Sequence, residues 1–520
     1  MMVDCVIVGG GIAGLATAYE LSRRGVSFVL LERAARPGGV ILSEEIDGFV
    51  IDGGPDALLV QKPDGIRLCE ELGLGDRLVS TKPPRLAYIQ RGGQLHALPA
   101  ASVLGIPTRV GPFLSTRLFS WLGKLRMGAE LFVPARRDEG DESIGSFMTR
   151  RFGLEATTYL AEPLLAGIHA GDVNRLSIRA LFPRFVEAER KHGSLLRAFR
   201  RPPPGQEAGA ETRSAIGVGD TRGRDGGSAS ARGSLEPLRD AKSPSNSGSG
   251  GAPPQLNGDG APRDVKNDGA FKSLPGGLSE LIRALVSAVP SGSMCLNSNV
   301  SRIIEQREQG SFRVERGSSD ATATRTVVIA TPAYATSSLT RELDGEISRA
   351  CSEIPYASAA TIVLAFPRQA VAHPLNGSGF VVPRAENKDK AGIMAASWLS
   401  SKWPHRAPDD KVLLRTFVGG ARDPQALEES DAELVSRSMR ALRPLLRITG
   451  EPLFSRIYRW DRANAQHEVG HLDRVAAIGR ALTRHPGLFI TGSGFRGTGI
   501  PDCVADGRAT GTRVAEWLRV

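Results

Sequence analysis

Residues 3–32 read VDCVIVGGGIAGLATAYELSRRGVSFVLLE, and this stretch decides the fold at the start of the chain. Two apolar runs flank a helix-like run, which is the β-α-β pattern of a parallel sheet. Gly9, Gly11 and Gly14 form a GxGxxG between the first strand and the helix. The first glycine permits a tight turn, the second lets the backbone approach a pyrophosphate, and the third lets the helix pack closely on the strand. The stretch therefore predicts a dinucleotide site.

The residues that follow indicate which dinucleotide binds. Glu32 ends the second strand, where a carboxylate can accept hydrogen bonds from an adenosine ribose. The next residues, RAARPGG, bring Arg36 and a second glycine pair, Gly38–Gly39. A basic residue and a second glycine turn fit a cofactor that is held on both sides of its pyrophosphate. This pattern favours FAD over NAD.

The rest of the chain alternates in character. Residues from about Ser102 to His192 predict mainly helices, and LPGGLSELIRALVSAV (274–289) predicts another. FRVER (312–316) and RTVVIATP (325–332) predict strands. The runs AATIVLAF (359–366) and KVLLRTFVGG (411–420) are typical of an antiparallel sheet. The last stretch returns to a strand, a glycine-rich turn and a helix.

Residues 201–270 differ from everything around them. Of these 70 residues, 30 are Gly, Pro or Ser, and none is aromatic. Such a segment cannot bury enough apolar surface to offset the entropy lost on ordering. We predict a disordered linker insertion.

Composition bounds the function classes. The formal charge of the 520 residues is +10, but the basic residues are dispersed and no RNA-binding motif occurs, so we expect no nucleic-acid partner. The five cysteines form no CxxC pair, which argues against a disulfide framework. No run of about 18 apolar residues predicts a transmembrane helix. The N-terminus lacks a secretory signal, so we expect the chain to be cytoplasmic.

Four motifs carry a resemblance to a known family. They are GGGIAGL (9–15), ERxxRxGG (32–39), DGGP (52–55) and TGSGFRGTGIPDCVADGR (491–508). Together they resemble the monoamine oxidase-like flavoprotein superfamily. More narrowly, PPRLAYIQRGGQLHALP (83–99), LLAGIHAGDVNRLSIRALFPRFVEAERKHGSL (164–195), LPGGLSELIRAL (274–285) and GHLDRVAAI (470–478) are similar to the oxygen-dependent protoporphyrinogen oxidases. The resemblance covers nearly the whole chain outside 201–270.

The resemblance implies an α/β fold with three parts. A discontinuous Rossmann-like FAD-binding domain would comprise 1–82, 271–331 and 476–520. An α+β substrate domain with the antiparallel sheet would comprise 83–98 and 332–475. Residues 99–200 would form a helical, membrane-associating subdomain. There GPFLSTRLFSWLGKLRMGAELF (111–132) mixes aromatic and leucine residues with Arg117, Lys124 and Arg126. That mixture suits an interfacial surface, and it equally suits an amphipathic helix whose apolar side faces the core.

The resemblance also implies the cofactor-binding residues. Those that match FAD contacts of the family are Gly9, Gly11, Gly14, Glu32, Arg33, Arg36, Gly54, Pro55, Ala57, Val300, Thr498, Gly499 and Ile500. The last three match residues beside the flavin ring.

The implied substrate is protoporphyrinogen IX, a flexible tetrapyrrole ring that carries propionates and is oxidised in three two-electron steps, with oxygen as the acceptor. Because FAD takes the hydride, we expect no catalytic protein nucleophile. Arg85 matches an arginine that pairs with a propionate. Where many relatives have GFG, this chain has Gly379-Phe380 after Ser378, so Phe380 is the candidate for stacking on a pyrrole. His467 stands where a tyrosine is usual, which makes it a third candidate for substrate contact.

Alternatives stay open at this point. Coproporphyrinogen III, which has four propionates, is a second candidate substrate. Another enzyme of the superfamily, an amine oxidase or a carotenoid desaturase, would share the FAD fold. A membrane surface and a second copy of the chain are the macromolecular partners that the resemblance allows.

Residues 467–471 read HEVGH, which fits the HExxH pattern of zinc metalloproteases. Five residues fall at helical spacing: His467, His471, Val475, Ile478 and Leu482. We therefore predict a helix that turns both histidines toward its apolar side. No motif supplies a third zinc ligand, and the Gly-His pair at 470–471 also matches the oxidase family. We expect no metal site.

Overall fold

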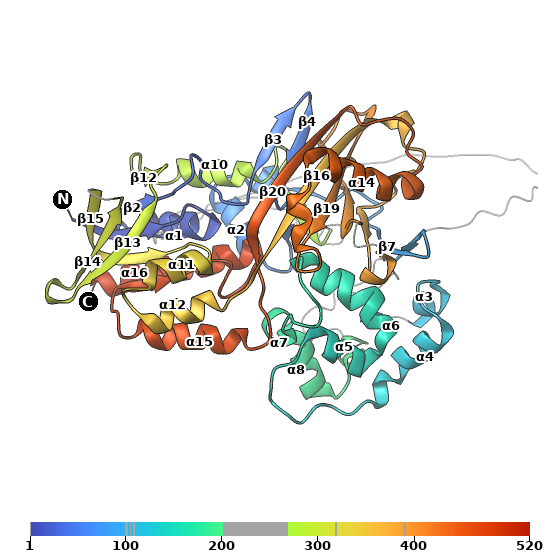
Figure 1. Ribbon diagram of the computed structural model, residues 1–520, viewed down its shortest axis with the longest axis horizontal. Helices are drawn as coiled ribbons and strands as arrows, with labels where there is room; N and C mark the ends of the chain where they lie inside the picture. The colour runs from blue at the N-terminus through green and yellow to red at the C-terminus, as the bar shows by residue number, and fades with distance from the viewer. Residues whose placement is uncertain are drawn as a thin grey trace, which may run out of the picture. The chain divides into compact units, whose positions relative to one another are not determined.

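The computed structural model describes residues 2–98, 102–103, 106–107, 110–200, 269–317, 320–387 and 392–519. The predicted linker at 201–270 thus lies outside the described residues except for its last two positions. The described chain contains a sheet of mainly parallel strands covered by helices, a second large sheet, and a group of short helices (Figure 1). The predicted α/β class is confirmed, while the domain boundaries stay a prediction.

The first sheet joins strands from distant parts of the sequence. Its parallel strands are β12 (Met294–Cys295), β2 (Phe28–Leu31), β1 (Val3–Val8), β15 (Asp320–Ile329) and β21 (Leu488–Ile490). The antiparallel strands β14 (Ser311–Arg316) and β13 (Val300–Gln306) extend it from β15. Most residues of β1 and β2 are buried, as expected for parallel strands that are covered on both faces.

Helices cover both faces of this sheet. The helices are α1 (Ile12–Arg23), α2 (Asp64–Glu71), α10 (Ser279–Ser287), α11 (Ala333–Thr340), α12 (Gly345–Ser352), α15 (His471–Leu482) and α16 (Ile500–Arg519). Helices α1 and α16 lie side by side in Figure 1. A Cβ on Gly507 would lie only 2.3 Å from the carbonyl oxygen of Ala13, so glycine sets this spacing.

The second sheet has the order β20-β16-β19-β18-β17-β7-β8. Its strands are β7 (Ala87–Arg91), β8 (Gln94–Ala97), β16 (Tyr356–Pro367), β17 (Gly379–Val381), β18 (Ala395–Trp398), β19 (Lys411–Gly419) and β20 (Phe454–Ala465). Every neighbouring pair is antiparallel except β17 and β7. The predicted antiparallel region is therefore confirmed.

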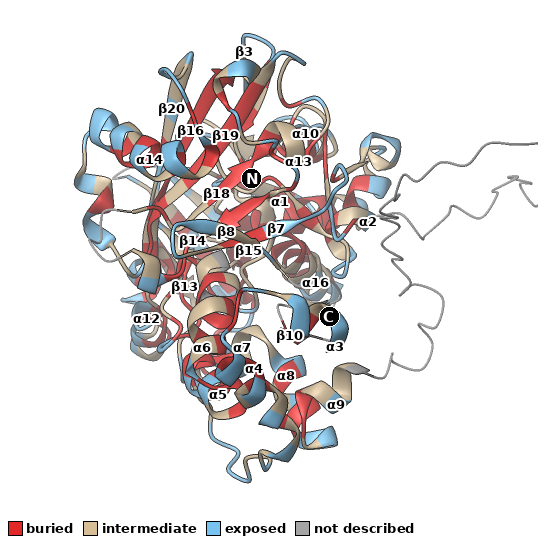
Figure 2. Cartoon of the chain, turned by 90° about the vertical axis from the view of Figure 1, so that its right-hand side faces the viewer, coloured by how far each residue is buried: buried red, intermediate tan, exposed pale blue. Residues whose placement is uncertain are grey.

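The two faces of the second sheet have different neighbours. Helix α14 (Asp431–Leu446) covers one face, and Figure 2 shows the central strands β16, β18 and β19 largely buried. The hairpin of β3 (Ser43–Ile46) and β4 (Phe49–Asp52) packs on the other face through a cluster that includes Tyr458 and Trp403. The hairpin brings the residues that follow β4 against this face. A short helix α13 (Leu399–Lys402) follows β18, and three small strands, β5 (Leu58–Leu59), β6 (Val79–Ser80) and β11 (Phe271–Ser273), form a separate sheet.

The region predicted to be helical is helical. It contains α3 (Val110–Ser115), α4 (Trp121–Gly128), η2 (Ala129–Phe132), α5 (Ile144–Phe152), α6 (Leu154–Ala156), η3 (Thr157–Ala166), η4 (Gly167–His169), α7 (Ile178–Leu181), α8 (Pro183–His192) and α9 (Leu195–Arg200). The segment η3 is a π-helix with a proline inside, and π-helical turns are frequent at functional sites. Near the start of this region, the short strands β9 (Ser102–Val103) and β10 (Ile106–Pro107) pair antiparallel.

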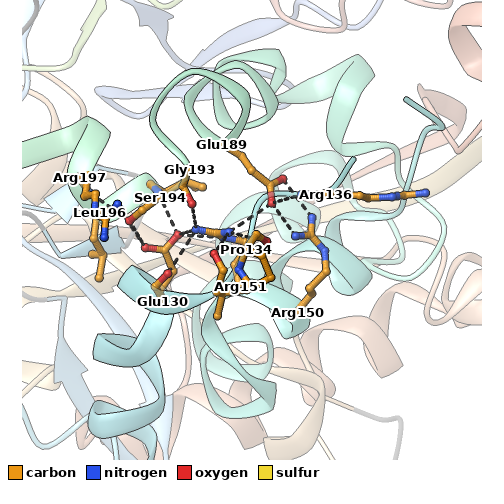
Figure 3. A network of polar contacts seen from close by, with 12 residues as sticks. Glu130, Pro134, Arg136, Arg150, Arg151, Glu189, Gly193, Ser194, Leu196 and Arg197 are labelled. Carbon is orange, nitrogen blue, oxygen red and sulfur yellow. Dashed lines mark hydrogen bonds and ion pairs between the residues drawn. The ribbon is translucent and has the colours of Figure 1, made fainter. Parts of the chain in front are cut away.

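Buried ion pairs tie these short helices together (Figure 3). We call Glu130, Arg150, Arg151 and Glu189 the helical cluster. Arg151 bonds both carboxylates, and both it and Glu130 are fully buried. Glu130 also accepts hydrogen bonds from the backbone N–H groups of Leu195 and Leu196. The cluster thereby connects η2, α5 and α8 to the first turn of α9.

One predicted helix start is wrong. Helix α15 begins at His471, and His467 precedes it in an extended segment after β20. The backbone of this segment pairs instead with the loop before α7, where Leu176 and Glu468 form an isolated bridge. Tertiary pairing thus ends the helix that the spacing predicts. None of the helices that the structure describes combines the length and hydropathy that crossing a bilayer requires.

Candidate functional site

The first glycine turn lies between β1 and α1. Gly9 has a φ of +109°, and a Cβ there would lie 2.8 Å from the carbonyl oxygen of Ala330. A Cβ on Gly14 would lie 2.0 Å from the carbonyl oxygen of Gly9. A Cβ on Gly11, in contrast, would meet no atom within 4 Å. Protein packing explains Gly9 and Gly14 but not Gly11, whose missing side chain leaves room for a ligand.

The N-terminus of α1 opens onto this room. The helix begins at Ile12, directly after Gly11, and no side chain caps it. The N–H groups of its first turn therefore have no intrahelical acceptor, and the helix dipole places positive charge there. The first turn also contains no acidic residue. This arrangement is suited to bind the phosphates of a dinucleotide.

Glu32 lies against the same turn. Its Oε2 accepts a hydrogen bond from the N–H of Gly10 at 2.6 Å, and its Oε1 accepts one from Ala34 at 2.8 Å. The N–H of Ser298 donates to the carbonyl oxygen of Glu32 at 2.8 Å, which brings the start of β13 at Val300 alongside. Because each carboxylate oxygen accepts more than one hydrogen bond, Glu32 can still accept from a ribose hydroxyl.

The second glycine turn packs on the first. A Cβ on Gly39, whose φ is +59°, would lie 3.5 Å from the Cα of Gly11. The guanidinium of Arg36 donates to the carbonyl oxygens of Gly39 at 2.7 Å and Ile41 at 3.1 Å. Arg36 therefore stabilises the second turn, while Arg33 is exposed beside it.

A third glycine turn follows β4 and lies against the second sheet. A Cβ on Gly54 would lie 1.9 Å from the carbonyl oxygen of Val40, so this turn touches the loop of the second one. The carbonyl oxygen of Gly53 accepts hydrogen bonds from the Thr361 hydroxyl at 2.6 Å and from Trp460 Nε1 at 2.9 Å. The turn is thus fixed between the second glycine turn and strands β16 and β20.

A buried group of charges lies beneath the third turn. We call Asp52, Asp56, Lys402, Arg406 and Arg415 the turn cluster. Arg415 donates to the carbonyl oxygens of Asp52 and Gly54, both at 2.8 Å, and its Nη2 lies 3.0 Å from Asp56. Lys402 lies 2.7 Å from Asp56, and Arg406 lies 2.8 Å from Asp52. Burial alone would raise the pKa of Asp56, but Lys402 and Arg415 lower it below its usual range. Asp56 is therefore ionised, and it fixes Pro55 and Ala57 on either side of it.

A fourth turn precedes α16. Helix α16 begins at Ile500, and the carboxylate of Asp502 accepts a hydrogen bond from the N–H of Gly499 at 3.2 Å. Both oxygens of Asp502 lie 2.7 Å from the ammonium of Lys62. The chain that follows the third turn is thereby joined to the turn at Thr498 and Gly499.

His169 contacts the fourth turn from the helical region. Its Nδ1 lies 3.2 Å from the hydroxyl oxygen of Thr498. Burial, with a further contribution from Lys62, lowers its pKa to about 4, so the imidazole is neutral near pH 7. The sequence analysis did not single out His169. The available signal was a lone histidine among small and apolar residues in LLAGIHAGD.

The two histidines of HEVGH support the loop before the fourth turn. Their rings stack at 3.8 Å between centroids and 9° between planes. His467 Nε2 lies 3.1 Å from the carbonyl oxygen of Ser493, and His471 Nε2 lies 2.9 Å from that of Phe495. Burial lowers the pKa of both imidazoles, that of His467 to about 3. Among the described residues, no three His, Cys, Asp or Glu side chains are grouped to hold a metal ion.

The structure does not bring Phe380 to the glycine turns. Its ring is buried in the core shared with α14, 6.4 Å from the ring of Trp398. Residues Thr361 and Arg415, which contact the third turn, are not part of that core. The contact of Phe380 with a substrate stays a prediction without support from this packing, and the buried ring of His467 likewise shows no path to a substrate.

Arg85 lies beside Thr81 and the backbone at Gly269. It is exposed, and its Nε donates to the carbonyl oxygen of Thr81 at 3.0 Å. A Cβ on Gly269 would lie 2.7 Å from that Nε, and the next residue, Ala270, accepts a hydrogen bond from the N–H of Val60. This connects Arg85 through a short path to Lys62 and the fourth turn.

Comparisons with known proteins agree with this arrangement. Residues 12–515 match the family described as flavin containing amine oxidoreductase. The chain belongs to this family. Its cofactor is FAD, and the chain is an FAD-dependent oxidoreductase. The open space at Gly11, the uncapped start of α1 and the carboxylate of Glu32 all fit that cofactor.

Within this family, the chain is similar to porphyrinogen oxidases. The chain is 32% identical over 512 residues to the coproporphyrinogen III oxidase of Bacillus subtilis, covering 97% of this chain and 96% of the relative. It is 28% identical over 530 residues to the chloroplastic protoporphyrinogen oxidase of Oryza sativa, covering 99% and 88%. A solved structure from Exiguobacterium sp. 255-15, named provisionally as a protoporphyrinogen oxidase, matches with a TM-score of 0.78 at 28% identity and covers 99% of both chains.

Proposed function

We propose that the chain oxidises a porphyrinogen to the corresponding porphyrin, with coproporphyrinogen III as the preferred substrate and protoporphyrinogen IX as the second candidate. The observation that carries the proposal is the similarity over almost the full length of both chains to the Bacillus subtilis coproporphyrinogen III oxidase. The similarity to the chloroplastic protoporphyrinogen oxidase is lower, and we therefore propose that substrate as the second candidate.

The reaction removes three hydrides and three protons from the porphyrinogen, and three molecules of oxygen become hydrogen peroxide. Bound FAD supplies the hydride acceptor and the route to oxygen. The protein binds the cofactor and the substrate and orients them toward each other. In this proposal the first two glycine turns hold the pyrophosphate, Glu32 binds the ribose beside Val300, and the third and fourth turns hold the flavin ring. The turn cluster keeps the third turn in place by bonding its carbonyl oxygens.

The assignment of the first turn can be tested with Gly11→Ala. Since a Cβ on Gly11 meets no protein atom, the variant should fold as well as the wild type but lose most of its FAD. The FAD content of the purified protein, read from its visible spectrum, measures this. Gly479→Ala on α15 is the matched control, because a Cβ there also meets open space, far from the turns in sequence. Full FAD content in Gly11→Ala would contradict the assignment.

We assign Arg85 to a propionate of the substrate. A charge-assisted hydrogen bond of this kind contributes about 1.5 to 3 kcal/mol. Arg85→Ala should therefore raise the Michaelis constant for the porphyrinogen by about tenfold or more, with the FAD content unchanged. A Michaelis constant equal to that of the wild type would remove Arg85 from the substrate site.

The substrate preference is measured directly. Purified protein is mixed in air with each porphyrinogen in turn, and the fluorescence of the porphyrin product is followed. The proposal expects both to react and coproporphyrinogen III to show the higher kcat/KM. A yellow protein that forms no porphyrin from either would refute the proposal and favour an amine or carotenoid substrate.

An exposed apolar surface in the helical region supports a membrane partner. It consists of Trp121, Leu122, Leu125, Phe132 and Leu154, with exposed fractions between 69% and 84%. Helix α4 buries Gly123, Lys124 and Met127, while the apolar side chains of Trp121, Leu122 and Leu125 face outward. Large exposed apolar patches mark interaction surfaces. The aromatic and leucine side chains, with exposed Arg117 close by in the sequence, suit the interface of an anionic lipid bilayer.

Vesicle flotation tests this attachment. The holoenzyme should float with vesicles that contain phosphatidylglycerol, and the double variant Leu122→Glu, Leu125→Glu should not. Leu453→Glu, which changes an exposed leucine elsewhere, should float like the wild type. If the wild type does not float but the double variant converts a dimer to a monomer, a second copy of the chain is the partner instead.

A further inference from the structure

His169 is held in a defined place by its own backbone. It ends the short 3-10 turn η4, which follows the π-helix η3. Its carbonyl oxygen accepts a hydrogen bond from Gln466 Nε2 at 2.9 Å. The next residue, Ala170, has a φ of +51° and accepts a hydrogen bond from the N–H of Ala421 at 2.8 Å. A non-glycine residue in this region of φ costs energy that the surrounding contacts must offset. The histidine is therefore fixed from both sides.

The ring of His169 has one nitrogen engaged and one open. Nδ1 faces the hydroxyl of Thr498 at 3.2 Å, and the ring of Phe182 lies edge-on at 6.3 Å between centroids. Within the described parts of the chain, the ring hydrogen bond of His169 is the one at Nδ1, and Nε2 forms none. When Nδ1–H donates to the Thr498 oxygen, Nε2 carries the lone pair and can accept a proton. In this tautomer the Thr498 hydroxyl holds Nδ1, and Nε2 is free to act as a base.

The proposed reaction needs such a base. The conversion of a porphyrinogen to a porphyrin breaks four C–H bonds of the methylene bridges and two N–H bonds of the pyrroles. Three bridges each lose a hydride, so the three protons come from two pyrroles and from the fourth bridge. As the hydride leaves for the flavin, positive charge develops on the pyrrole and makes its N–H acidic. A neutral acceptor near the ring can take the proton in the same step, which lowers the barrier to flavin reduction. Thr498 lies in the turn that we assign to the flavin ring, so a base beside it lies beside the reacting part of the substrate.

We infer that His169 is the base that accepts the pyrrole proton as the porphyrinogen loses its hydride. In the two steps that break an N–H bond, its electron pair becomes part of the new C=N bond. In the remaining step the C–H pair of the fourth bridge becomes part of a new C=C bond. In every step the proton binds Nε2 of His169, and the imidazolium then releases it to water. The inference rests on the proposed porphyrinogen oxidation and adds the residue that takes the protons.

The charges around His169 are compatible with this role. Lys62 lowers the pKa of His169, and Asp502 acts in the opposite direction. His169 in turn contributes to the lowered pKa of His467. Burial and Lys62 keep the resting imidazole neutral, so the base is present in its free form before each step. The imidazolium is held only briefly for the same reason, which favours release of the proton after each of the three steps.

The test is chemical rescue in the flavin reduction step. Anaerobic holoenzyme is mixed rapidly with coproporphyrinogen III, and the loss of the flavin absorption is followed. His169→Ala should slow this reduction by about a hundredfold, within the range typical of general-base catalysis, while FAD content stays that of the wild type. Added imidazole should restore a large part of the rate. His192→Ala, which removes an exposed histidine of α8, is the matched control and should react as the wild type does.

The outcomes separate the base role of His169 from the proposed function. A rate within twofold of the wild type, or a slow rate that imidazole does not restore, overturns the base role and leaves His169 a packing residue. A wild-type holoenzyme that neither porphyrinogen reduces overturns the proposed function and the inference with it. Thr498→Val serves as a second variant in case His169→Ala loses FAD. It retains the approximate side-chain volume but loses the hydroxyl that bonds Nδ1 and orients the ring, so it should slow flavin reduction by roughly tenfold. Unchanged reduction in Thr498→Val would also overturn the inference.

Discussion

The helical cluster and the turn cluster are both largely buried, and both pair opposite charges, but they connect different parts of the chain. In the helical cluster Glu130 and Glu189 bond Arg151, and the backbone contacts go to the start of α9 (Figure 3). In the turn cluster Arg415 bonds the carbonyl oxygens of Asp52 and Gly54, which belong to a predicted cofactor turn. One cluster stabilises short helices, while the other shapes a binding loop.

The difference shows what a buried charge can be used for. Desolvation offsets much of the attraction in a buried ion pair, so such a pair is a weak source of net stability. Its hydrogen bonds are directional, however, and they fix backbone groups that apolar packing would leave unsatisfied. In the helical cluster only stability depends on such buried ion pairs. In the turn cluster we propose that cofactor binding depends on them as well.

The largest expected effect comes from the helical cluster. Arg151→Met leaves Glu130 and Glu189 buried without that partner, and breaking a buried pair from one side costs about 3 to 5 kcal/mol. Denaturant unfolding should show a loss of this size. Protein that remains folded should contain FAD in the wild-type proportion. Arg190→Met, an exposed change on α8, is the control. A folded Arg151→Met protein that lacks FAD would remove the distinction between the clusters.

The turn cluster should respond in two ways at once. In Arg415→Met the partner Lys402 still neutralises Asp56, so the expected loss of stability is smaller, about 2 to 3 kcal/mol. The carbonyl oxygens of Asp52 and Gly54 lose their donor, so the third turn should move and the FAD content should fall. Denaturant unfolding and the visible spectrum measure the two effects on one sample. Full FAD content in Arg415→Met would show that the turn holds its shape without the cluster.

The sequence predicts much of this fold because its signals are local. The GxGxxG turn, the helix at residues 13–25 and the apolar runs of β15, β16 and β19 form as predicted. The helix predicted at 274–289 begins only at Ser279, after Pro275 and a glycine pair. The HEVGH helix is wrong at its start because Glu468 pairs with Leu176, nearly three hundred residues earlier. Periodicity carries no information about such a distant partner.

The candidate site divides in the same way. Glycine spacing locates the first turn, and the structure shows a physical reason for each of Gly9, Gly11 and Gly14. The turn cluster escapes the sequence because Arg415 looks like one more charged residue in an apolar strand. Only the sheet register, which places its side chain on the face of the third turn, reveals the contact. His169 escapes for the same reason, since its partner Thr498 is 329 residues away.

Buried histidines differ from both clusters, because His467 is buried beside another histidine and not beside a carboxylate. The pKa of His467 is about 3 in the folded chain, because burial and the neighbouring His471 disfavour its protonated form. The unfolded chain has the ordinary value near 6.5, so it binds the proton more readily. The stability from this depressed pKa is complete above pH 6.5 and is lost as pH falls toward 3.

The measurement compares denaturant unfolding at pH 7 and pH 5. The titration of His467 should lower the free energy of unfolding by about 2 kcal/mol over this interval. The glutamine in His467→Gln cannot titrate but retains a donor for the carbonyl oxygen of Ser493. Between pH 7 and pH 5 the free energy of unfolding of this variant should therefore fall by about 2 kcal/mol less than that of the wild type. His96→Gln, which changes a partly exposed histidine, is the control and should follow the wild type. An equal pH dependence in all three proteins would show that the imidazole is not buried in solution.

The smallest effect is expected where an ion pair is exposed. Arg302 and Glu342 form a close pair, but their side chains are 51% and 62% exposed. Water and salt screen the attraction, and ordering two long side chains costs entropy, so such pairs contribute between 0 and about 1 kcal/mol. Arg302→Gln should therefore change the free energy of unfolding by less than about 1 kcal/mol, and high salt should remove the difference. If Arg302→Gln costs as much stability as Arg151→Met, then burial does not set the energy of an ion pair in this protein. Contact geometry alone would then set it.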